Sequence, residues 1–392
     1  MMLSRSRLRR PVSPGRVFSV AGIGILVAVL GAPQALASAP GDAVQCGDTV
    51  TASIQLDSDL NCTGAALTIA ASGVTVDLGG HTVVGTTSGI SAQNQTDVTI
   101  VNGTVGGGIS LIGVKPSAFT NLRVDSLTLK LGTRVVATDS VIQNGNINLQ
   151  GDLSLVRSSM IGVHTRAMSS GITMTDSTVT DSGFSTNGVG FTLTRNTLTR
   201  TVIGEDESGN QVAIDNKFIQ SHLDVLLVNS LDIENNQFTG PGSGLAVDDS
   251  IFRASTVKGN VFDGARVGIA INTANFGRID NIAITHNVFF NNSAAGILLE
   301  APKGDGAHGV AISDNVFASN GKASNGFVDR HGVPVDDGVH VDIPAGNQVT
   351  IGNNVTLDNA DHGIEATPGT VIDGGGNISV GDPNGCVGVV CK

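Results

Sequence analysis

The side chains best suited to proton transfer or cation binding gather near the C-terminus of this 392-residue chain. Residues 329–342 combine four aspartates with two histidines and an arginine. Imidazoles and carboxylates act as general acids and bases, and carboxylate oxygens bind Ca²⁺. The candidates, with two flanking glutamates, are Asp329, Arg330, His331, Asp337, His340, Asp342, Glu300 and Glu365.

Alternating polarity predicts how strands would position these groups. Five segments begin at a glycine and continue with apolar residues at the first and third positions, starting at Gly244, Gly268, Gly296, Gly338 and Gly363. Because successive side chains of a strand point to opposite faces, the second and fourth positions face outward. The second positions hold Ala246, Ala270, Leu298, His340 and Glu365, and the fourth hold Asp248, Asn272, Glu300, Asp342 and Thr367. We expect one outer face that carries acids and a histidine beside the longest turn, residues 319–337.

Cation-assisted cleavage of a polysaccharide is one chemistry that this face predicts. On neighbouring strands Glu300 and Asp342 would lie about 5 Å apart, close enough to share a Ca²⁺ ion, with Asp248 in the same column. The ion would acidify the α-proton of a uronate, and His340 or Arg330 would then act as the base for β-elimination.

Hydrolysis of a glycosidic bond is the second catalytic alternative, with paired carboxylates as acid and base. Asp337 joins His340 and Arg330 as a catalytic candidate on this interpretation. Asp329, His331 and Glu365 are the expected contacts to the substrate.

A non-catalytic alternative fits the same residues. The chain has no Trp and no Tyr, although aromatic faces are the usual platforms for sugar rings. A row of Asp, Asn and Glu on an acidic surface also serves solubility without binding anything. We therefore expect the protein to engage an extracellular polysaccharide through its C-terminal loops and this face, with the lyase, the hydrolase and a structural or adhesive rod at the cell surface as alternatives.

A repeated phrase, apolar-x-apolar-x-x-Asn-x-apolar, determines the expected architecture. Its copies begin near residues 74, 98, 122, 135, 153, 172, 191, 212, 231, 255, 282, 310 and 349. A period of mostly 18–28 residues predicts a solenoid, and the two-residue spacing of its apolar positions predicts strands. Stacked in parallel, such short strands would form an all-β, right-handed parallel β-helix of about 12–13 coils.

The asparagine and phenylalanine positions of the repeat are expected to be structural. The asparagines at residues 196, 236, 260, 287, 315 and 354 would form a hydrogen-bonded ladder along the axis. Phe238, Phe262, Phe289 and Phe317 would stack inside the coils, with Phe218 joining them through a one-residue slip.

With these phrases, the chain resembles right-handed parallel β-helix repeat proteins of the pectin-lyase-like superfamily, including NosD-like repeat proteins. The segments CGDTVTASIQLDSDLNCTGAALTIAASGVTVDLGGHTVVG (46–85) and DDGVHVD through CVGVVC (336–391) are similar to the end coils of secreted actinobacterial members. The resemblance implies the fold for nearly the whole mature chain. It leaves the activity open, since the superfamily includes lyases, hydrolases, epimerases and adhesins.

Residues 1–37 have the basic start, apolar centre and Ala-Leu-Ala end of a signal peptide. We expect cleavage after Ala37, and a single secreted domain over residues 38–392. This leader holds five arginines and no acid, so the remainder has 17 basic and 34 acidic residues, a formal charge of −17. Such a charge disfavours nucleic acid and anionic membranes as partners. No later segment is long and apolar enough to insert into a membrane, and the chain is expected to be monomeric.

Four cysteines lie at the two ends of the predicted solenoid. Three pairings are possible, and terminal placement favours Cys46–Cys62 and Cys386–Cys391, which would each staple an end coil. Metal binding by these thiols is the lesser alternative in an exported chain.

Overall fold

The computed structural model describes residues 43–392, except residues 168–170, 207–208, 250, 274–277, 302–305 and 323–324. The predicted signal peptide, residues 1–37, lies outside this part of the chain. The described residues form strands and turns and contain no helix, and none of them belongs to a helix that could cross a membrane. The expected fold class is confirmed, because the strands stack in parallel into a β-solenoid of about 14 turns.

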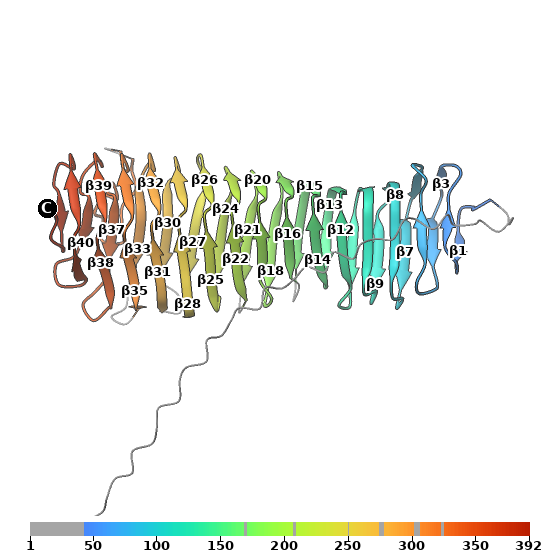
Figure 1. The fold of residues 1–392 in the computed structure, drawn as a ribbon, viewed down its shortest axis with the longest axis horizontal. Coiled ribbons are helices and arrows are strands. Elements are labelled where there is room, and N and C mark those ends of the chain that lie inside the picture. The colour runs from blue at the N-terminus through green and yellow to red at the C-terminus, as the bar shows by residue number, and fades with distance from the viewer. Residues whose placement is uncertain are drawn as a thin grey trace, which may run out of the picture. The chain divides into compact units, whose positions relative to one another are not determined.

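Three ladders of parallel strands make up the solenoid, and the coils follow one another in sequence order from β1 to β43 (Figure 1). Ladder A contains β2 (Ile54–Gln55), β5 (Thr75–Asp77), β8 (Val98–Gly106), β10 (Ser117–Val124), β12 (Arg134–Thr138), β14 (Asp152–Val156), β16 (Ile172–Thr175), β19 (Phe191–Thr194), β22 (Asn210–Ile214), β25 (Ser230–Glu234), β28 (Ile251–Lys258), β31 (Ile279–Thr285), β34 (Ala307–His308), β35 (Val310–Ser313), β38 (Val349–Gly352) and β41 (Ile372–Gly375).

Ladder B follows the short asparagine or serine turn of each coil. It contains β3 (Leu60–Cys62), β6 (Thr82–Gly85), the second halves of β8 and β10, the first halves of β13 (Val141–Leu149) and β15 (Ser159–Ala167), β17 (Thr178–Thr180), β20 (Thr197–Thr199), β23 (Lys217–Ile219), β26 (Gln237–Thr239), β29 (Val261–Asp263), β32 (Val288–Phe290), β36 (Val316–Ala318), β39 (Val355–Leu357) and β42 (Ile378–Val380).

Ladder C is the face that carries the candidate site. It contains β1 (Asp48–Val50), β4 (Ala65–Ile69), β7 (Ser88–Gln93), β9 (Ile109–Ile112), β11 (Leu127–Lys130), the second halves of β13 and β15, β18 (Gly183–Asn187), β21 (Val202–Asp206), β24 (His222–Leu226), β27 (Gly244–Asp248), β30 (Val267–Asn272), β33 (Ala295–Glu300), β37 (Val339–Asp342), β40 (Ile364–Ala366) and β43 (Cys386–Val387).

The solenoid has about 14 turns, whereas the repeated phrase predicts about 12–13 coils, and the difference lies at the two ends. Strand β2 precedes the first recognised repeat at residue 74, and β41 follows the last one at residue 349. Both strands belong to end coils in which the apolar-x-apolar-x-x-Asn phrase has degenerated, so the sequence pattern did not count them.

Buried asparagines connect successive coils between ladders A and B. In each step, one Oδ1 accepts hydrogen bonds from the backbone N–H and the Nδ2 of the asparagine in the preceding coil, at 2.8–3.2 Å. The members are Asn196, Asn216, Asn236, Asn260, Asn287, Asn315, Asn354 and Asn377. Toward the N-terminus serines take over, since the Ser177 backbone N–H donates to Asn196 Oδ1 at 2.9 Å.

Five phenylalanines stack directly inside ladder B, with ring centroids 4.4–4.9 Å apart. The expected one-residue slip at Phe218 is wrong. Phe218 pairs in register with Phe238, and Asn216, two residues earlier, is a regular member of the asparagine ladder. The sequence suggests a slip because Val212 and Ile214 imitate the apolar alternation, whereas Gln211 and Ala213 are the residues that pair in register with Leu231 and Ile233.

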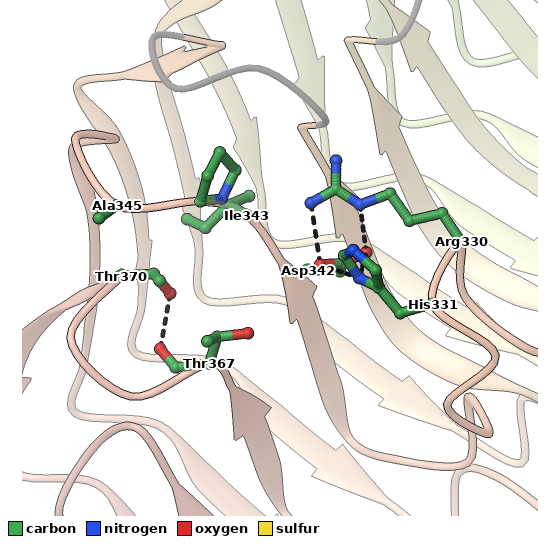
Figure 2. Close-up of a pocket in the computed structure, with 8 residues that line it drawn as sticks. Arg330, His331, Asp342, Ile343, Ala345, Thr367 and Thr370 are labelled. Atoms are coloured by element: carbon green, nitrogen blue, oxygen red, sulfur yellow. Dashed lines mark hydrogen bonds and ion pairs between the residues drawn. The ribbon is translucent and has the colours of Figure 1, made fainter.

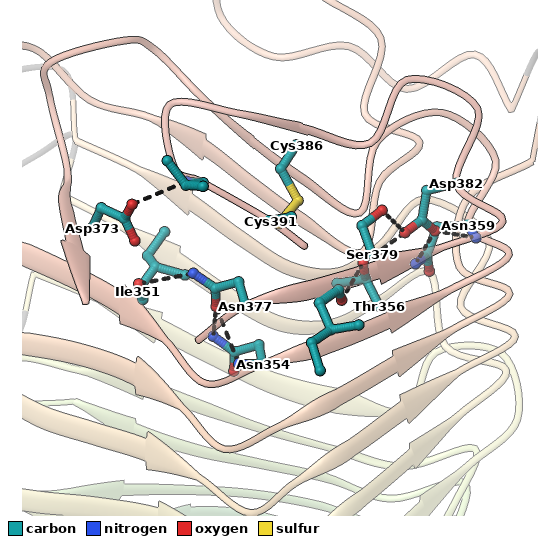
Figure 3. Close-up of a disulfide and its surroundings, with 12 residues drawn as sticks. Ile351, Asn354, Thr356, Asn359, Asp373, Asn377, Ser379, Asp382, Cys386 and Cys391 are labelled. Carbon is teal, nitrogen blue, oxygen red and sulfur yellow. Dashed lines mark hydrogen bonds between the residues drawn. A yellow bond between two sulfur atoms is a disulfide. The ribbon is translucent and has the colours of Figure 1, made fainter. Parts of the chain in front are cut away.

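Both disulfides that terminal placement favoured are present, Cys46–Cys62 and Cys386–Cys391. Figure 3 shows the C-terminal bridge above the last asparagine of the ladder, Asn377. Nearby, the Asp382 carboxylate accepts hydrogen bonds from Asn359 and Thr356 at 2.6–2.9 Å. A carboxylate is an acceptor only, so Asp382 ends a second ladder of amides, which starts at Asn292.

Replacing Asn260 with alanine should destabilise the solenoid. The backbone N–H and the Nδ2 of Asn236 both donate to Asn260 Oδ1, at 2.8 and 2.9 Å. Without this oxygen the backbone N–H would stay buried without a partner, and Nδ2 would keep only its hydrogen bond to the Ala213 carbonyl. Each such group costs about 1–3 kcal/mol, so calorimetry should show a lower melting temperature. Gln237→Ala, on an exposed neighbour, is the control, and equal melting temperatures for the two variants would contradict a structural role for the ladder.

Candidate functional site

The long turn between β36 and β37 folds back over ladder C. An antiparallel bridge between Val328 and Pro334 closes its tip. The Arg266 guanidinium lies over the Phe327 ring, 4.1 Å from the centroid. A small apolar cluster fastens the turn to β33 and contains Ala294, Ala295, Leu298 and Val335, with Val267 and Phe327 packed against it. We call residues 325–335 the covering loop.

The covering loop changes the environment of the predicted outer face. His340 and Asp342 are outward positions of β37, yet they are only 2% and 5% exposed. At this strand the structure therefore differs from the solvent-exposed face that the alternation of polarity predicts. Part of the signal was in the sequence, because residues 325–335 include the apolar side chains of Phe327, Val328, Val333 and Val335.

The register of the strands places the residues of each predicted column on neighbouring coils, as expected. Leu298 pairs with His340, which pairs with Glu365. Asn272 pairs with Glu300, which pairs with Asp342. Asp248 lies on the coil before Asn272.

Arg330 occupies the space in which Glu300 and Asp342 would share a cation. Its guanidinium donates to both oxygens of Asp342, at 2.6 and 3.0 Å. Its backbone N–H donates to Glu300 Oε1 at 3.3 Å, and His331 Nδ1 lies 3.1 Å from Asp342. A Ca²⁺ ion shared by these two carboxylates would have to displace a bidentate arginine, which is among the strongest partners of a carboxylate.

Asp248 lies apart from these groups. Burial, followed by the neighbouring charges of Asp224 and Asp249, raises the pKa of Asp248 to about 6. Within the described part of the chain, the three-residue clusters with metal-ligand spacing contain neither Asp248 nor Glu300.

His340 lies at the centre of a buried acid–base cluster. Its Nδ1 is 2.7 Å from Asp337 Oδ2 and 3.1 Å from Glu365 Oε2. Its Nε2 is 3.4 Å from Asp329 Oδ2 in the covering loop. The side chains of His340 and Asp337 are 3% and 0% exposed, whereas that of Glu365 is 24% exposed. Glu365 is therefore the member of the cluster that a ligand can touch.

Burial and hydrogen bonds shift the pKa values of this cluster in opposite directions. Burial alone would lower the pKa of His340, but hydrogen bonds with Asp337 and Glu365 outweigh it and raise the pKa to about 10. Burial would raise the pKa of Asp337, but the partner imidazoles of His340 and His362 lower it overall. Likewise, backbone N–H groups and His340 overcome burial and hold the pKa of Asp329 below its usual range. The cluster is thus an imidazolium among carboxylates at neutral pH.

Two further ionisable residues flank the cluster and were not among the predicted site residues. His362 Nδ1 lies 3.2 Å from Asp361 and 3.5 Å from Asp337, and the contact to Asp337 raises its pKa. Burial and the adjacent Asp337 charge raise the pKa of Asp336. The sequence showed both as ordinary turn residues, because the coil that brings them together is visible only in three dimensions.

Two adjoining hollows open beside the covering loop. The larger, of about 470 Å³, is lined by Arg330, His331, Asp342, Ile343, Pro344, Ala345, Thr367 and Thr370. Figure 2 shows the Arg330 guanidinium and the His331 ring on one side of it, and Thr367 and Thr370 on the other. The smaller, of about 200 Å³, shares His331, Asp342 and Thr367 and reaches Asp329, His340 and Glu365. The covering loop thus forms a wall of polar groups around an opening with an apolar floor.

A hollow of about 530 Å³ also lies on the N-terminal coils. Its lining includes Asp77, Asn102, Asn121 and Arg123. None of its lining residues is a histidine, and the side chains mostly bind one another, as Asn102 Nδ2 donates to Asp77 at 3.1 Å. We therefore place the candidate site at the covering loop.

Comparisons with known proteins leave the family open. No family profile matches the chain, and no curated protein matches it. Among solved structures, it is similar to the mannuronan C-5 epimerase AlgE4 A-module of Azotobacter vinelandii, at 16% identity and a TM-score of 0.33, over 88% of this chain and 91% of that one.

Two alginate lyase structures are also similar. One, a PL6 alginate lyase in complex with a trisaccharide, has 11% identity and a TM-score of 0.28, over 88% of this chain and 81% of that one. The other, alginate lyase AlyF-OU02 in complex with G6, has 11% identity and a TM-score of 0.24, over 86% and 79%. At such values we take neither a substrate nor a catalytic residue from these proteins.

Stability should fall as the pH rises from about 6.5 to about 10. The folded pKa of His340, about 10, lies above its unfolded value of about 6.5. The cluster's stabilisation is therefore fully present below about 6.5 and is lost as the pH rises through the folded pKa. Urea unfolding of the wild type in metal-free buffer between pH 6 and 9.5 should show a loss of several kcal/mol, since each pH unit is worth up to about 1.4 kcal/mol.

His340→Gln should remove most of this dependence of stability on pH. His222→Gln, on the same ladder far from the cluster, should keep it. A wild type whose stability is flat across this range would show that His340 is not held as an imidazolium.

Proposed function

We propose that the protein is exported and binds an extracellular polysaccharide in the two hollows beside the covering loop. The observation that carries this proposal is the covering loop itself. It lies over the outer face of ladder C and places Arg330 and His331 opposite the Thr367–Thr370 turn, above Ile343 and Pro344. Hydroxyl-rich sugars bind to such combinations of fixed polar groups and small apolar surfaces.

The acidic composition and the two disulfides also support an exported protein. The chain is acidic overall, and its cysteines form two disulfides at the ends of the solenoid. Disulfides persist mainly in secreted and surface proteins. Together with the predicted signal peptide over residues 1–37, this supports export, and an extracellular glycan is then an accessible partner.

Hydrolysis is the second candidate function, and it rests on the exposure of Glu365. This carboxylate faces the smaller hollow, and its Oε2 lies 3.1 Å from the buried His340. Asp329 and Asp342 also line this hollow, but they are buried and already paired with His340 and Arg330. Glu365 is thus the carboxylate available for the acid–base chemistry that cleaves a glycosidic bond.

Calcium-dependent elimination has less support from this geometry. Arg330 already neutralises Asp342, and an arginine, which cannot be deprotonated in proteins, is a poor base. His340, the other candidate base, is 3% exposed and in contact with Asp337 and Glu365, so a sugar ring cannot reach it directly.

Arg330→Ala should weaken glycan binding at least about tenfold, the equivalent of one lost charge-assisted hydrogen bond. The measurement is titration of the mature chain, residues 38–392, with soluble neutral glycans and polyuronates. Arg195→Ala is a matched control, because Arg195 makes the same bidentate pair with Asp176, at 2.7 and 2.9 Å, and neither residue lines any of the three hollows. Equal affinities for the two variants would refute binding at the covering loop.

Glu365→Gln should abolish any hydrolysis while it leaves glycan affinity within about threefold, since the amide keeps the shape but loses the acid. New reducing ends should appear with the wild type and be absent with the variant. Asp361→Asn, another partly exposed carboxylate, should retain turnover. An unsaturated product would point to elimination instead of hydrolysis.

A further inference from the structure

The turns before β37 and β40 hold a second group of ligand-type atoms that the glycan site does not use. Asp337, Asp361 and His362 each offer one ligand atom, and these atoms lie within 4.8 Å of one another. Asp337 comes from the turn before β37, and the other two come from the turn before β40. Neighbouring coils thus contribute to one cluster.

The spacing of these atoms suits an ion better than a direct hydrogen bond. His362 Nδ1 is buried and makes no hydrogen bond of suitable geometry; its contacts are ion pairs with Asp361 Oδ2 and Asp337 Oδ1 at 3.2 and 3.5 Å. Two ligands bound at 2.0–2.2 Å to one ion are separated by roughly 3–3.5 Å. The two observed separations fall in this range, so a cation between the three atoms could replace these ion pairs with metal–ligand bonds.

Other contacts already orient the ligands. Asp337 Oδ1 accepts the His362 backbone N–H at 3.0 Å, and Asp337 Oδ2 lies 2.7 Å from His340. The other oxygen of Asp361 accepts a hydrogen bond from Asn384 Nδ2. Such supporting hydrogen bonds fix ligand geometry in metal sites.

The surroundings favour a positive charge. A further carboxylate oxygen, Asp336 Oδ1, is buried without a hydrogen-bond partner, and Asp336 faces Asp337, Asp361 and Glu365. His340 and His362 are the only imidazoles that face these acids in the described part of the chain. A cation would offset the excess of negative charge.

We infer that Asp337, Asp361 and His362 bind a divalent transition-metal ion of the Zn²⁺ or Mn²⁺ type. An imidazole with two carboxylates matches such ions, whereas Ca²⁺ and Mg²⁺ prefer oxygen ligands alone. The ion connects the coils of β37 and β40, and through Asn384 it supports the turn before β43. None of its three ligands lines either hollow of the glycan site, although Asp337 contacts His340, which does.

The test is metal binding to the chelator-treated mature chain. Zn²⁺ should bind one to one by calorimetry and raise the melting temperature, Mn²⁺ should bind more weakly, and Ca²⁺ at the same concentration should give no shift. Hydrogen exchange should slow in β37, β40 and β43 when Zn²⁺ is added. A Zn²⁺ stoichiometry of zero, or an equal response to Ca²⁺, would overturn the inference.

Variants separate this site from adventitious binding. His362→Gln should lose the Zn²⁺ response, and Asn384→Ala should weaken Zn²⁺ binding about 10–100-fold. His331→Gln, in the neighbouring cluster of Asp329, His331 and Asp342, should bind as the wild type does. If His362→Gln is unstable without metal, Asn384→Ala decides, because Asn384 is no ligand itself. Unchanged affinity in Asn384→Ala together with loss in His331→Gln would place the ion elsewhere.

Discussion

Backbone hydrogen bonding between successive coils is the constraint on which the whole structure depends. Each coil pairs in parallel with the next in three ladders, so equivalent positions of the repeat must lie one above another. Asparagines then meet asparagines and phenylalanine rings meet phenylalanine rings along the axis. A change at one position is felt by the two neighbouring coils and by few others.

The candidate site exists because one coil departs from this regularity. Between β36 and β37 the chain is long enough to cross ladder C, and Phe327 and Val335 fasten it there. Once the outer face of β37 is covered, Asp337, His340 and Asp342 lose water and must find partners within the protein. They find them in one another, in Arg330, and in residues of the following coil.

Much of the fold followed from the repeat alone. The alternation around Gly296, Gly338 and Gly363 predicted the register that pairs His340 with Glu365 and Glu300 with Asp342. The repeated phrase did not predict Asn216 or Asn377 as members of the asparagine ladder, nor the end coils, because the phrase has degenerated there. In those coils, pairing with the neighbouring coil decides which residue takes each position of the repeat, and the local residues alone do not show it.

The sequence by itself determined the class of fold, the faces of the strands and which ionisable residues share a column, because a two-residue period and a coil repeat are local properties of the chain. Only the tertiary structure decided that Arg330 would bind Asp342, that His340 would be buried among Asp337, Glu365 and Asp329, and that His362 would face Asp337. These contacts depend on the path of the covering loop and of the turns, which follows from packing against distant coils rather than from any local pattern.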